Sequence, residues 1–98
     1  MPQCIILPSA EADLDSIWEF IARDSPQNAD RFVDSIYNFC RETLAYQVMM
    51  GRPRDGLAPG IRSYVFQRYL IFYRLIDDGI EVVHVYQGSR DIESLFQQ

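Results

Sequence analysis

The chain has 98 residues, 48% of them hydrophobic, and a formal net charge of −5. This length builds one domain around a single core, so we expect residues 1–98 to form one unit, and the negative charge argues against binding nucleic acid over the whole surface. No apolar run approaches the ~20 residues of a membrane-spanning helix, and the acidic beginning of the chain does not resemble a signal peptide, so we expect a cytoplasmic protein.

The charges are unevenly distributed. All nine basic residues are Arg, which favours planar, bidentate contacts over a general ammonium field. Residues 1–51 hold three Arg against eight acids, whereas residues 52–74 hold five Arg against Asp55 alone. Either a basic contact surface in the second half of the chain or a compositional bias explains this pattern.

The first half of the chain predicts a strand and a helix. Residues 5–7 form a short apolar run before Pro8, as expected of a strand. Ser9 stands where a helix N-cap belongs, with Glu11 in the first turn. Apolar residues then recur at helical spacing and predict one buried stripe, formed by Leu14, Ile17, Trp18 and Ile21.

A second helix is expected from about Pro26 to about Gln47, with Ser25 as its cap. With the first helix it forms an antiparallel hairpin. Tyr37, Phe39 and Tyr46 widen its apolar coverage beyond one stripe, so these rings contact either the sheet or a partner protein. Its stripe consists of Ala29, Phe32, Val33, Ile36, Cys40 and Leu44.

The second half predicts a loop and three strands. Residues 49–60 hold three of the five Gly and two of the five Pro, which indicates a loop. Residues 61–66, 69–76 and 80–87 are rich in β-branched and aromatic residues, as in an antiparallel meander. Asp78-Gly79 is a strong hairpin turn signal. The register of the hairpin at Gln67-Arg68 stays open, since a slip of one residue would exchange its faces.

A turn at Asp78-Gly79 would set Tyr73 opposite His84 and Ile71 opposite Tyr86. A two-residue loop at Gln67-Arg68 would place Arg62 beside Tyr73. One face of the sheet would then be a candidate functional surface, and the helices would cover the other. The first face would carry Arg62, Tyr64, Tyr73, His84 and Tyr86, and the second Leu70, Phe72, Val83 and Val85.

The first face has the residue types of an RNA-cleaving site, because Arg binds phosphate and Tyr or His transfers protons. The same residues also suit a half-buried sheet, because the apolar part of each side chain packs against the protein while its polar end stays in solvent. His84 is the only histidine, so an acid or base of imidazole type has to be this residue. The chain has no Lys to stabilise a transition-state charge.

No metal or cofactor is expected. Cys4 and Cys40 lack the spacing of a metal site and are expected to be two reduced, buried thiols. The stretch GRPRDGLAPG lacks the Gly-Lys-Ser/Thr ending of a phosphate loop.

Several motifs in this order resemble a known family. A short helix hairpin is followed in order by the MGRPR loop, the GIRSY strand, the YLIFYR strand and the GSRD corner. This order of motifs resembles that of ParE-type toxins of the RelE/ParE superfamily over nearly the whole chain. The resemblance implies an α+β fold of order β-α-α-β-β-β, with a helix hairpin packed on one face of a mainly antiparallel sheet. Gln87 stands where many relatives carry His, and the chain is acidic where many relatives are basic.

The resemblance also implies a function. ParE-like proteins are the toxins of type II toxin–antitoxin modules, inhibit DNA gyrase and are neutralised by a ParD-like antitoxin in a hetero-oligomer. RelE-like relatives instead cut mRNA on the ribosome, and a third alternative is an inactive module that only binds antitoxin. An acidic toxin fits a protein target better than direct sequence-specific binding of nucleic acid.

By motif position, the residues expected to contact the target are Arg62, Arg68, Tyr69, Tyr73, His84, Arg90 and Asp91. Arg90 and Asp91 could instead form an ion pair with each other, in which case they would only stabilise the backbone conformation of the GSRD corner. Antitoxin binding is expected at the acidic helix hairpin and an exposed strand edge, with Trp18, Tyr37 and Phe39 as anchors.

Overall fold

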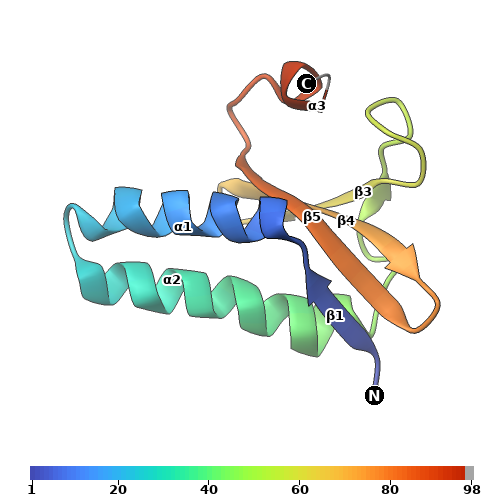
Figure 1. Cartoon of the computed structure of the whole chain (residues 1–98), viewed down its shortest axis with the longest axis horizontal. Coiled ribbons are helices and arrows are strands. Elements are labelled where there is room, and N and C mark those ends of the chain that lie inside the picture. The colour runs from blue at the N-terminus through green and yellow to red at the C-terminus, as the bar shows by residue number, and fades with distance from the viewer. Residues whose placement is uncertain (97–98) are drawn as a thin grey trace.

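The computed structural model describes residues 1–96, which form an α+β fold with two helices against a five-stranded sheet (Figure 1). The order predicted from the sequence is confirmed and extended by a short strand in the expected loop and a short helix near the C-terminus. The elements are β1 (Gln3–Ile6), α1 (Pro8–Ala22), α2 (Pro26–Phe39), the π-helix η1 (Cys40–Leu44), β2 (Arg52–Pro53), β3 (Arg62–Phe66), β4 (Tyr69–Ile76), β5 (Gly79–Gln87) and α3 (Ile92–Phe96).

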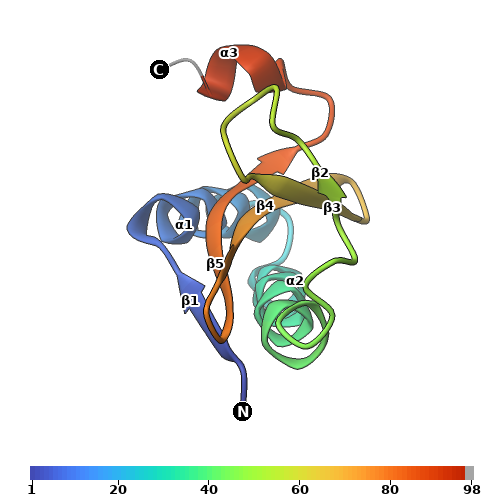
Figure 2. The same ribbon diagram turned by 90° about the vertical axis from the view of Figure 1, so that its right-hand side faces the viewer.

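The sheet has the order β1-β5-β4-β3-β2. Strands β2 to β5 pair antiparallel with their neighbours, and β1 pairs parallel to β5. Figure 2 shows the twisted sheet with α1 and α2 together on one side and α3 beyond the opposite side. None of the helices within residues 1–96 is long and apolar enough to cross a membrane.

The N-cap of helix α1 lies two residues earlier than predicted. Its N-cap is Leu7, whose side chain makes no capping bond, and Pro8 occupies the first turn, where its fixed φ is already helical. The expectation that Ser9 caps the helix is wrong, because its hydroxyl instead donates to the carbonyl of Val83 at 2.5 Å. Ser9 therefore fastens the first turn of α1 to β5.

Helix α2 begins as predicted, with the Ser25 hydroxyl accepting from the backbone N–H of Asn28 at 3.2 Å. It ends at Phe39 rather than near Gln47, and the chain continues as η1. The backbone N–H of Ala45 donates to the carbonyl of Cys40 at 3.0 Å, a bond that spans five residues and widens the turn.

The β3–β4 hairpin has the register that a two-residue loop predicts. Arg62 pairs with Tyr73 and Phe66 with Tyr69, and Gln67 in the turn has a φ of 55°.

The predicted β4–β5 register is wrong in two places. The turn residues are Asp77 and Asp78, because Ile76 pairs with Gly79. Gly79 takes a φ of 132°, and a Cβ on it would lie 1.9 Å from the carbonyl oxygen of Gln3, so only glycine fits beside β1.

A β-bulge causes the second difference. Tyr73 pairs with Val82 and Phe72 pairs with His84, so Val83 is an extra residue on β5. Ile71 then pairs with Val85 and Leu70 with Tyr86, in place of the expected pairs of Tyr73 with His84 and Ile71 with Tyr86.

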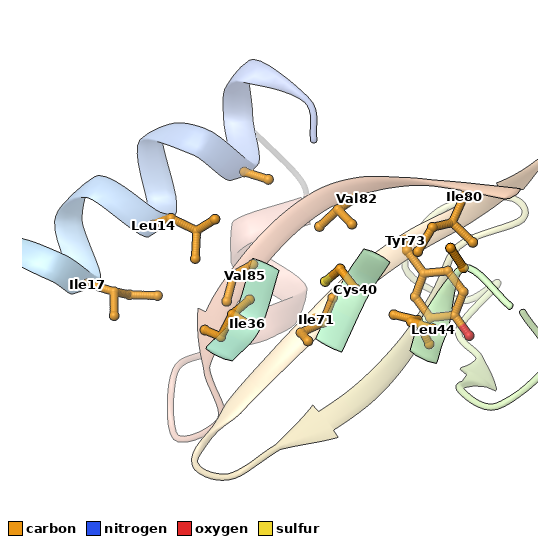
Figure 3. Close-up of a cluster of buried hydrophobic side chains, with 12 residues drawn as sticks. Leu14, Ile17, Ile36, Cys40, Leu44, Ile71, Tyr73, Ile80, Val82 and Val85 are labelled. Carbon is orange, nitrogen blue, oxygen red and sulfur yellow. The ribbon is translucent and has the colours of Figure 1, made fainter. Parts of the chain in front are cut away.

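The helices therefore cover the face that was expected to be open. Tyr73 and Ile71 belong to the core beneath α1 and α2, and Tyr64 packs against it. Of the residues expected beneath the helices, Val85 is there, whereas Leu70, Phe72 and Val83 belong to the other side. Figure 3 shows this core, with Leu14, Ile17, Ile36, Cys40 and Leu44 from the helical layer facing Ile71, Tyr73, Ile80, Val82 and Val85 from the sheet.

The opposite face carries a smaller core. Phe72, Tyr86 and Ile61 are buried there, covered by the loop around Leu57 and by α3. The ring of Phe96, in α3, lies edge-on to Phe72 at 4.8 Å between centroids. Both faces of the sheet are thus covered, and the exposed functional groups lie at its edges and corners.

Candidate target-binding site

Arg62 and Tyr73 hold the segment that leads from η1 to β2. Tyr73 is completely buried, and its hydroxyl donates to the carbonyl of Val48 and accepts from the backbone N–H of Gly51, both at 2.8 Å. Arg62 is half-buried and donates to the carbonyl of Met49 at 3.2 Å and to that of Gly51. We call Arg62, Tyr73 and Gly51 the latch. The Tyr73 hydroxyl and Nη2 of Arg62 are engaged within the protein, whereas Nε of Arg62 is buried and has no hydrogen-bond partner within residues 1–96. These contacts make the latch a structural unit.

Arg68 and Tyr69 lie at the opposite end of β4. The exposed Arg68 is in the β3–β4 turn, and its carbonyl accepts a hydrogen bond from Gly88 at 2.9 Å. The half-buried ring of Tyr69 is tilted against Phe32 of α2, with 5.2 Å between centroids. The bond from Gly88 ties the β3–β4 turn to the end of β5, so the two segments form one corner.

Asp13 anchors helix α1 to the edge of β5. Strand β1 pairs with β5 only as far as Val82, and α1 borders the rest of that edge. The Oδ2 atom of Asp13 lies 2.8 Å from Nδ1 of His84 and accepts from the backbone N–H of Val85 at 3.0 Å. The carboxylate thereby orients the imidazole and satisfies a backbone donor on the edge of β5 that β1 does not reach.

Tyr86 lies between His84 and Arg90. The imidazole of His84 stacks on the Tyr86 ring at 4.5 Å between centroids, and the guanidinium of Arg90 lies 5.5 Å from the same centroid. Burial, followed by the carboxylate of Asp13, raises the pKa of the Tyr86 hydroxyl, and the charge of Arg90 opposes both effects. Tyr86 is therefore neutral near pH 7 and cannot readily act as a base.

A hollow of about 180 Å³ opens beside this group, between α1 and the corner. Phe20 is 62% exposed although it is large and apolar, and it contributes one wall. We call this region the corner site. Its lining residues are Asp13, Ser16, Ile17, Phe20, Tyr69, Val85, Gln87 and Arg90.

Asp91 begins helix α3. Its carboxylate accepts from the backbone N–H of Ser94 at 3.4 Å and from the Ser94 hydroxyl at 2.7 Å, as an N-cap does. The guanidinium of Arg90 lies over the ring of Tyr86. Asp91 thus bonds to α3, and Arg90 packs on the sheet.

The family comparison decides what kind of protein has this geometry. The model of the "ParE toxin of type II toxin-antitoxin system, parDE" matches residues 4–92. The chain belongs to the ParE toxin family. No curated protein sequence matches it.

Solved structures share the fold. A chain of the chromosomal ParDE toxin–antitoxin system from P. aeruginosa aligns with a TM-score of 0.72 at 23% identity, covering 89% of this toxin and 96% of that chain. A chain of the toxin–antitoxin complex RelBE2 from Mycobacterium tuberculosis aligns with a TM-score of 0.67 at 22% identity, covering 89% and 99%. The matched chains of the ParDE and RelBE2 systems therefore share the architecture of this chain.

The residues predicted to bind the target of this ParE-family toxin separate into two groups. Arg62 and Tyr73 form the latch, on the helix-covered side. Arg68, Tyr69 and Arg90 lie at the corner. His84 stacks on the ring of Tyr86, and Asp91 caps the start of α3. The expectation of one continuous face that carries Arg62, Tyr64, Tyr73, His84 and Tyr86 is wrong, because the β-bulge puts the last two on the opposite side of the sheet from the others.

Several residues that line the corner site are not among those that the sequence predicts to contact a partner. Asp13, Phe20 and Gln87 are examples. Asp13 precedes Ile17 by four residues and so borders the buried stripe, which is the signal that could have placed it against the sheet. Arg54 lies in the expected loop, but its guanidinium is 5.8 Å from the ring centroid of Phe72.

The three expected antitoxin anchors are all half-buried in the helical layer. Trp18 Nε1 donates to Asp30 at 2.8 Å and so joins α1 to α2. The Tyr37 hydroxyl donates to Glu11 at 2.6 Å, and burial, followed by this bond, raises the pKa of that hydroxyl. The ring of Phe39 stacks on Tyr64 at 5.1 Å.

Within residues 1–96 no group of three or more His, Cys, Asp or Glu side chains is placed to hold a metal ion.

Proposed function

We propose that this ParE-family toxin inhibits DNA gyrase by binding it, and that a ParD-like antitoxin neutralises the toxin. The proposal rests on which polar groups form contacts within the protein and which remain exposed. Tyr73 is buried with its hydroxyl fully engaged, Arg62 bonds to backbone carbonyls, and Asp13 holds His84. Arg68 and Arg90 remain exposed at the corner, where they can contact a partner. Such a surface suits recognition, because it presents cations and an exposed aromatic ring.

The test adds the purified toxin to DNA gyrase with supercoiled plasmid and ATP. Linear cleaved DNA or loss of supercoiling activity, abolished by an excess of antitoxin, supports gyrase as the target. Arg90→Ala should weaken the inhibition, whereas the control Arg41→Ala, an exposed arginine in η1, should not. Gyrase that works normally at saturating toxin would refute the proposal.

Ribosome-dependent cleavage of mRNA is the second candidate, and one observation favours it. A carboxylate that orients an imidazole through Nδ1 is the arrangement of a general base, and Asp13 and His84 have it at 2.8 Å. In this case His84→Gln should abolish cleavage of ribosome-bound mRNA, and Asp13→Asn should reduce it strongly.

The antitoxin is proposed to bind the acidic helix hairpin and the outer edge of β3. Strand β2 pairs only with Arg62 and Ser63, so the outer edge of β3 from Tyr64 to Phe66 has no strand partner within residues 1–96, and Val65 is 64% exposed. An extended peptide can add to such an edge.

Trp18, Tyr37 and Phe39 remain the proposed anchors of the antitoxin. Each is replaced by Ala, and affinity for the antitoxin is measured by calorimetry with Tyr46→Ala as an exposed control. Thermal unfolding of each variant separates loss of binding from loss of stability. Wild-type affinity in all three folded variants would place the antitoxin elsewhere. A toxin that binds antitoxin but affects neither gyrase nor ribosome-bound mRNA would be an inactive binding module.

A further inference from the structure

Two adjoining hollows lie at the end of the sheet away from the corner site, where β3 begins and β4 ends. Figure 2 shows the loop between β2 and β3 at this end. The hollows have volumes of about 350 and 320 Å³, and both are lined by Pro53 and Asp55. We call this region the basic end, because arginines line both hollows. They are Arg52 and Arg54 in the first hollow and Arg62 and Arg74 in the second.

The charges of these arginines are weakly neutralised by the protein itself. Arg74 is the member of the set that forms an ion pair within residues 1–96, and its distance to Glu81 is 3.8 Å, too long for a hydrogen bond. Solvent screens this pair, because both side chains are partly exposed. Arg62 donates to backbone carbonyls, and Arg54 donates to the Ser63 hydroxyl at 3.2 Å. These acceptors carry no full negative charge.

The carboxylates that line the hollows do not balance the arginines. The Oδ1 atom of Asp55 accepts from the backbone N–H of Gly60 at 2.9 Å, and Glu93 belongs to α3. Four positive and two negative side chains line the basic end, which leaves an excess of two positive charges in a chain of net charge −5. Four of the five arginines of residues 52–74 thus lie together in space.

The hollow of Arg62 and Arg74 also has an apolar wall. Met49 is 66% exposed and Leu75 is 43% exposed, although both side chains are large and apolar, and both line this hollow. A guanidinium group binds a carboxylate through two parallel N–H donors. The hollow therefore has contacts for a carboxylate and for an apolar group beside it.

We propose that the basic end binds an acidic peptide segment of a partner protein, in which a carboxylate stands next to an apolar side chain. The carboxylate binds Arg62 and Arg74, and the apolar side chain packs on Met49 and Leu75. Further acidic residues of the segment lie towards the other two arginines of the basic end. This site is separate from the corner site and does not require gyrase to be the target of the toxin.

Nucleic acid is the other polyanion that arginines bind, and two observations favour a peptide. A phosphate backbone has no apolar group to cover Met49 and Leu75. The negative net charge of the chain repels a long polyanion, whereas a short acidic segment contacts only the basic end. Side chains hold the peptide, because β2 has only two residues and its Pro53 lacks the N–H that pairing with an added strand requires.

The experiment titrates the purified toxin with the fluorescein-labelled peptide acetyl-Glu-Leu-Glu-Leu-Glu-amide and follows anisotropy at low ionic strength. We expect saturable binding that weakens as salt is added. Replacing each Glu of the peptide by Gln, or each Leu by Gly, should weaken binding by about threefold or more. In nuclear magnetic resonance spectra, the peptide should shift the backbone amide signals of Gly60, Ile61 and Leu75.

Three results would overturn the proposal. The first is the absence of saturable binding, and the second is equal affinity for the peptides with Glu and with Gln. The third is tighter binding of a single-stranded thymidine oligonucleotide of the same charge, which would make the basic end a nucleic-acid site.

Substitutions in the toxin locate the site. Arg74→Gln should weaken binding of the peptide by about threefold to tenfold. The control Arg31→Gln removes an exposed arginine of α2 and should change affinity by less than about twofold. Glu81→Gln should strengthen binding by about twofold, because Glu81 no longer competes for Arg74. Equal affinities for Arg74→Gln and Arg31→Gln would overturn the assignment.

Arg62→Gln tests the other side of the same hollow. Because Arg62 also belongs to the latch, thermal unfolding of this variant is measured beside its affinity for the peptide. A folded Arg62→Gln protein should bind the peptide about threefold to tenfold more weakly, and wild-type affinity would overturn its role. If this variant does not fold, Arg74→Gln and Glu81→Gln, which change affinity in opposite directions, decide the question.

Discussion

The hydroxyl of Tyr73, in the centre of the sheet, accepts a hydrogen bond from the backbone N–H of Gly51 at 2.8 Å, across 22 residues of sequence. It also donates to the carbonyl of Val48 at 2.8 Å. One buried side chain thereby satisfies a donor and an acceptor of the segment between η1 and β2. The latch thus explains how the irregular backbone of this segment can lie against the core with these polar groups satisfied.

Removing this hydroxyl should destabilise the fold. Tyr73→Phe leaves the carbonyl of Val48 and the N–H of Gly51 without their partner, so we expect the free energy of unfolding to fall by about 1–3 kcal/mol. Urea unfolding measures this change. The control Tyr46→Phe removes a hydroxyl from a side chain that is 56% exposed and should change stability by less than about 0.5 kcal/mol. Equal midpoints for the two variants would contradict the role of the latch.

Gly51 is packed too closely to accept a side chain. A Cβ there would lie 2.6 Å from the Tyr73 hydroxyl oxygen and 2.7 Å from the carbonyl oxygen of Ser63. Gly51→Ala should therefore lower the free energy of unfolding by about 1–3 kcal/mol, as measured in urea. Gly56→Ala is the matched control, because a Cβ on Gly56 would have no neighbouring atom within 4 Å. Equal free energies of unfolding for Gly51→Ala and Gly56→Ala would show that the residues of the latch can move to accommodate the added methyl group.

Asp13 should contribute to stability through both of its partners. Asp13→Ala removes the acceptor of His84 Nδ1 and of the Val85 backbone N–H, so we expect a loss of about 1–3 kcal/mol. Asp15→Ala, on the exposed side of the same helix, should be near neutral. A double-mutant cycle with His84→Ala isolates the side-chain pair, and a coupling energy near zero would mean that only the backbone contact matters.

Tyr37 should make the fold sensitive to alkaline pH. Burial and the bond to Glu11 raise the pKa of its hydroxyl above the ordinary value of 10.0. The folded state then holds a proton that the unfolded state releases, so this contribution is complete below about pH 10 and is lost as pH rises further.

Tyr37→Phe lacks this titration. Its free energy of unfolding, measured in urea between about pH 9 and 11, should decline less steeply with pH than that of the wild-type protein. Parallel declines would argue that Tyr37 ionises equally in both states.

The elements of the fold could be predicted from local patterns, but their register could be predicted only in part. The Gln67-Arg68 loop has the two residues that place Arg62 beside Tyr73, and the structure confirms this pairing. The Asp78-Gly79 signal is misleading, because Gly79 is needed for its close approach to β1, a contact that turn chemistry does not reveal. The position of the β4–β5 turn therefore depends on the parallel pairing of β5 with β1, which is distant in the sequence.

The corner site was predictable in its parts but not as an assembly. Arg68, Tyr69 and Arg90 come from recognisable motifs, and they meet at one corner of the sheet. The predicted face for His84 is wrong, because the regular alternation of side chains along a strand does not predict a bulge. The extra residue Val83 exchanges the faces of the sheet on which the following residues of β5 lie.

The parallel pairing of β1 with β5 has a consequence for the order of folding. Gln3 pairs with Gly79, so the first strand has its partner only after β5 has been synthesised. Until then a nascent chain can form the helix hairpin but not the sheet that buries its apolar stripe. Because the corner residues come from α1, from the start of β4 and from the segment that follows β5, the corner site of a partly made chain is assembled only late in synthesis.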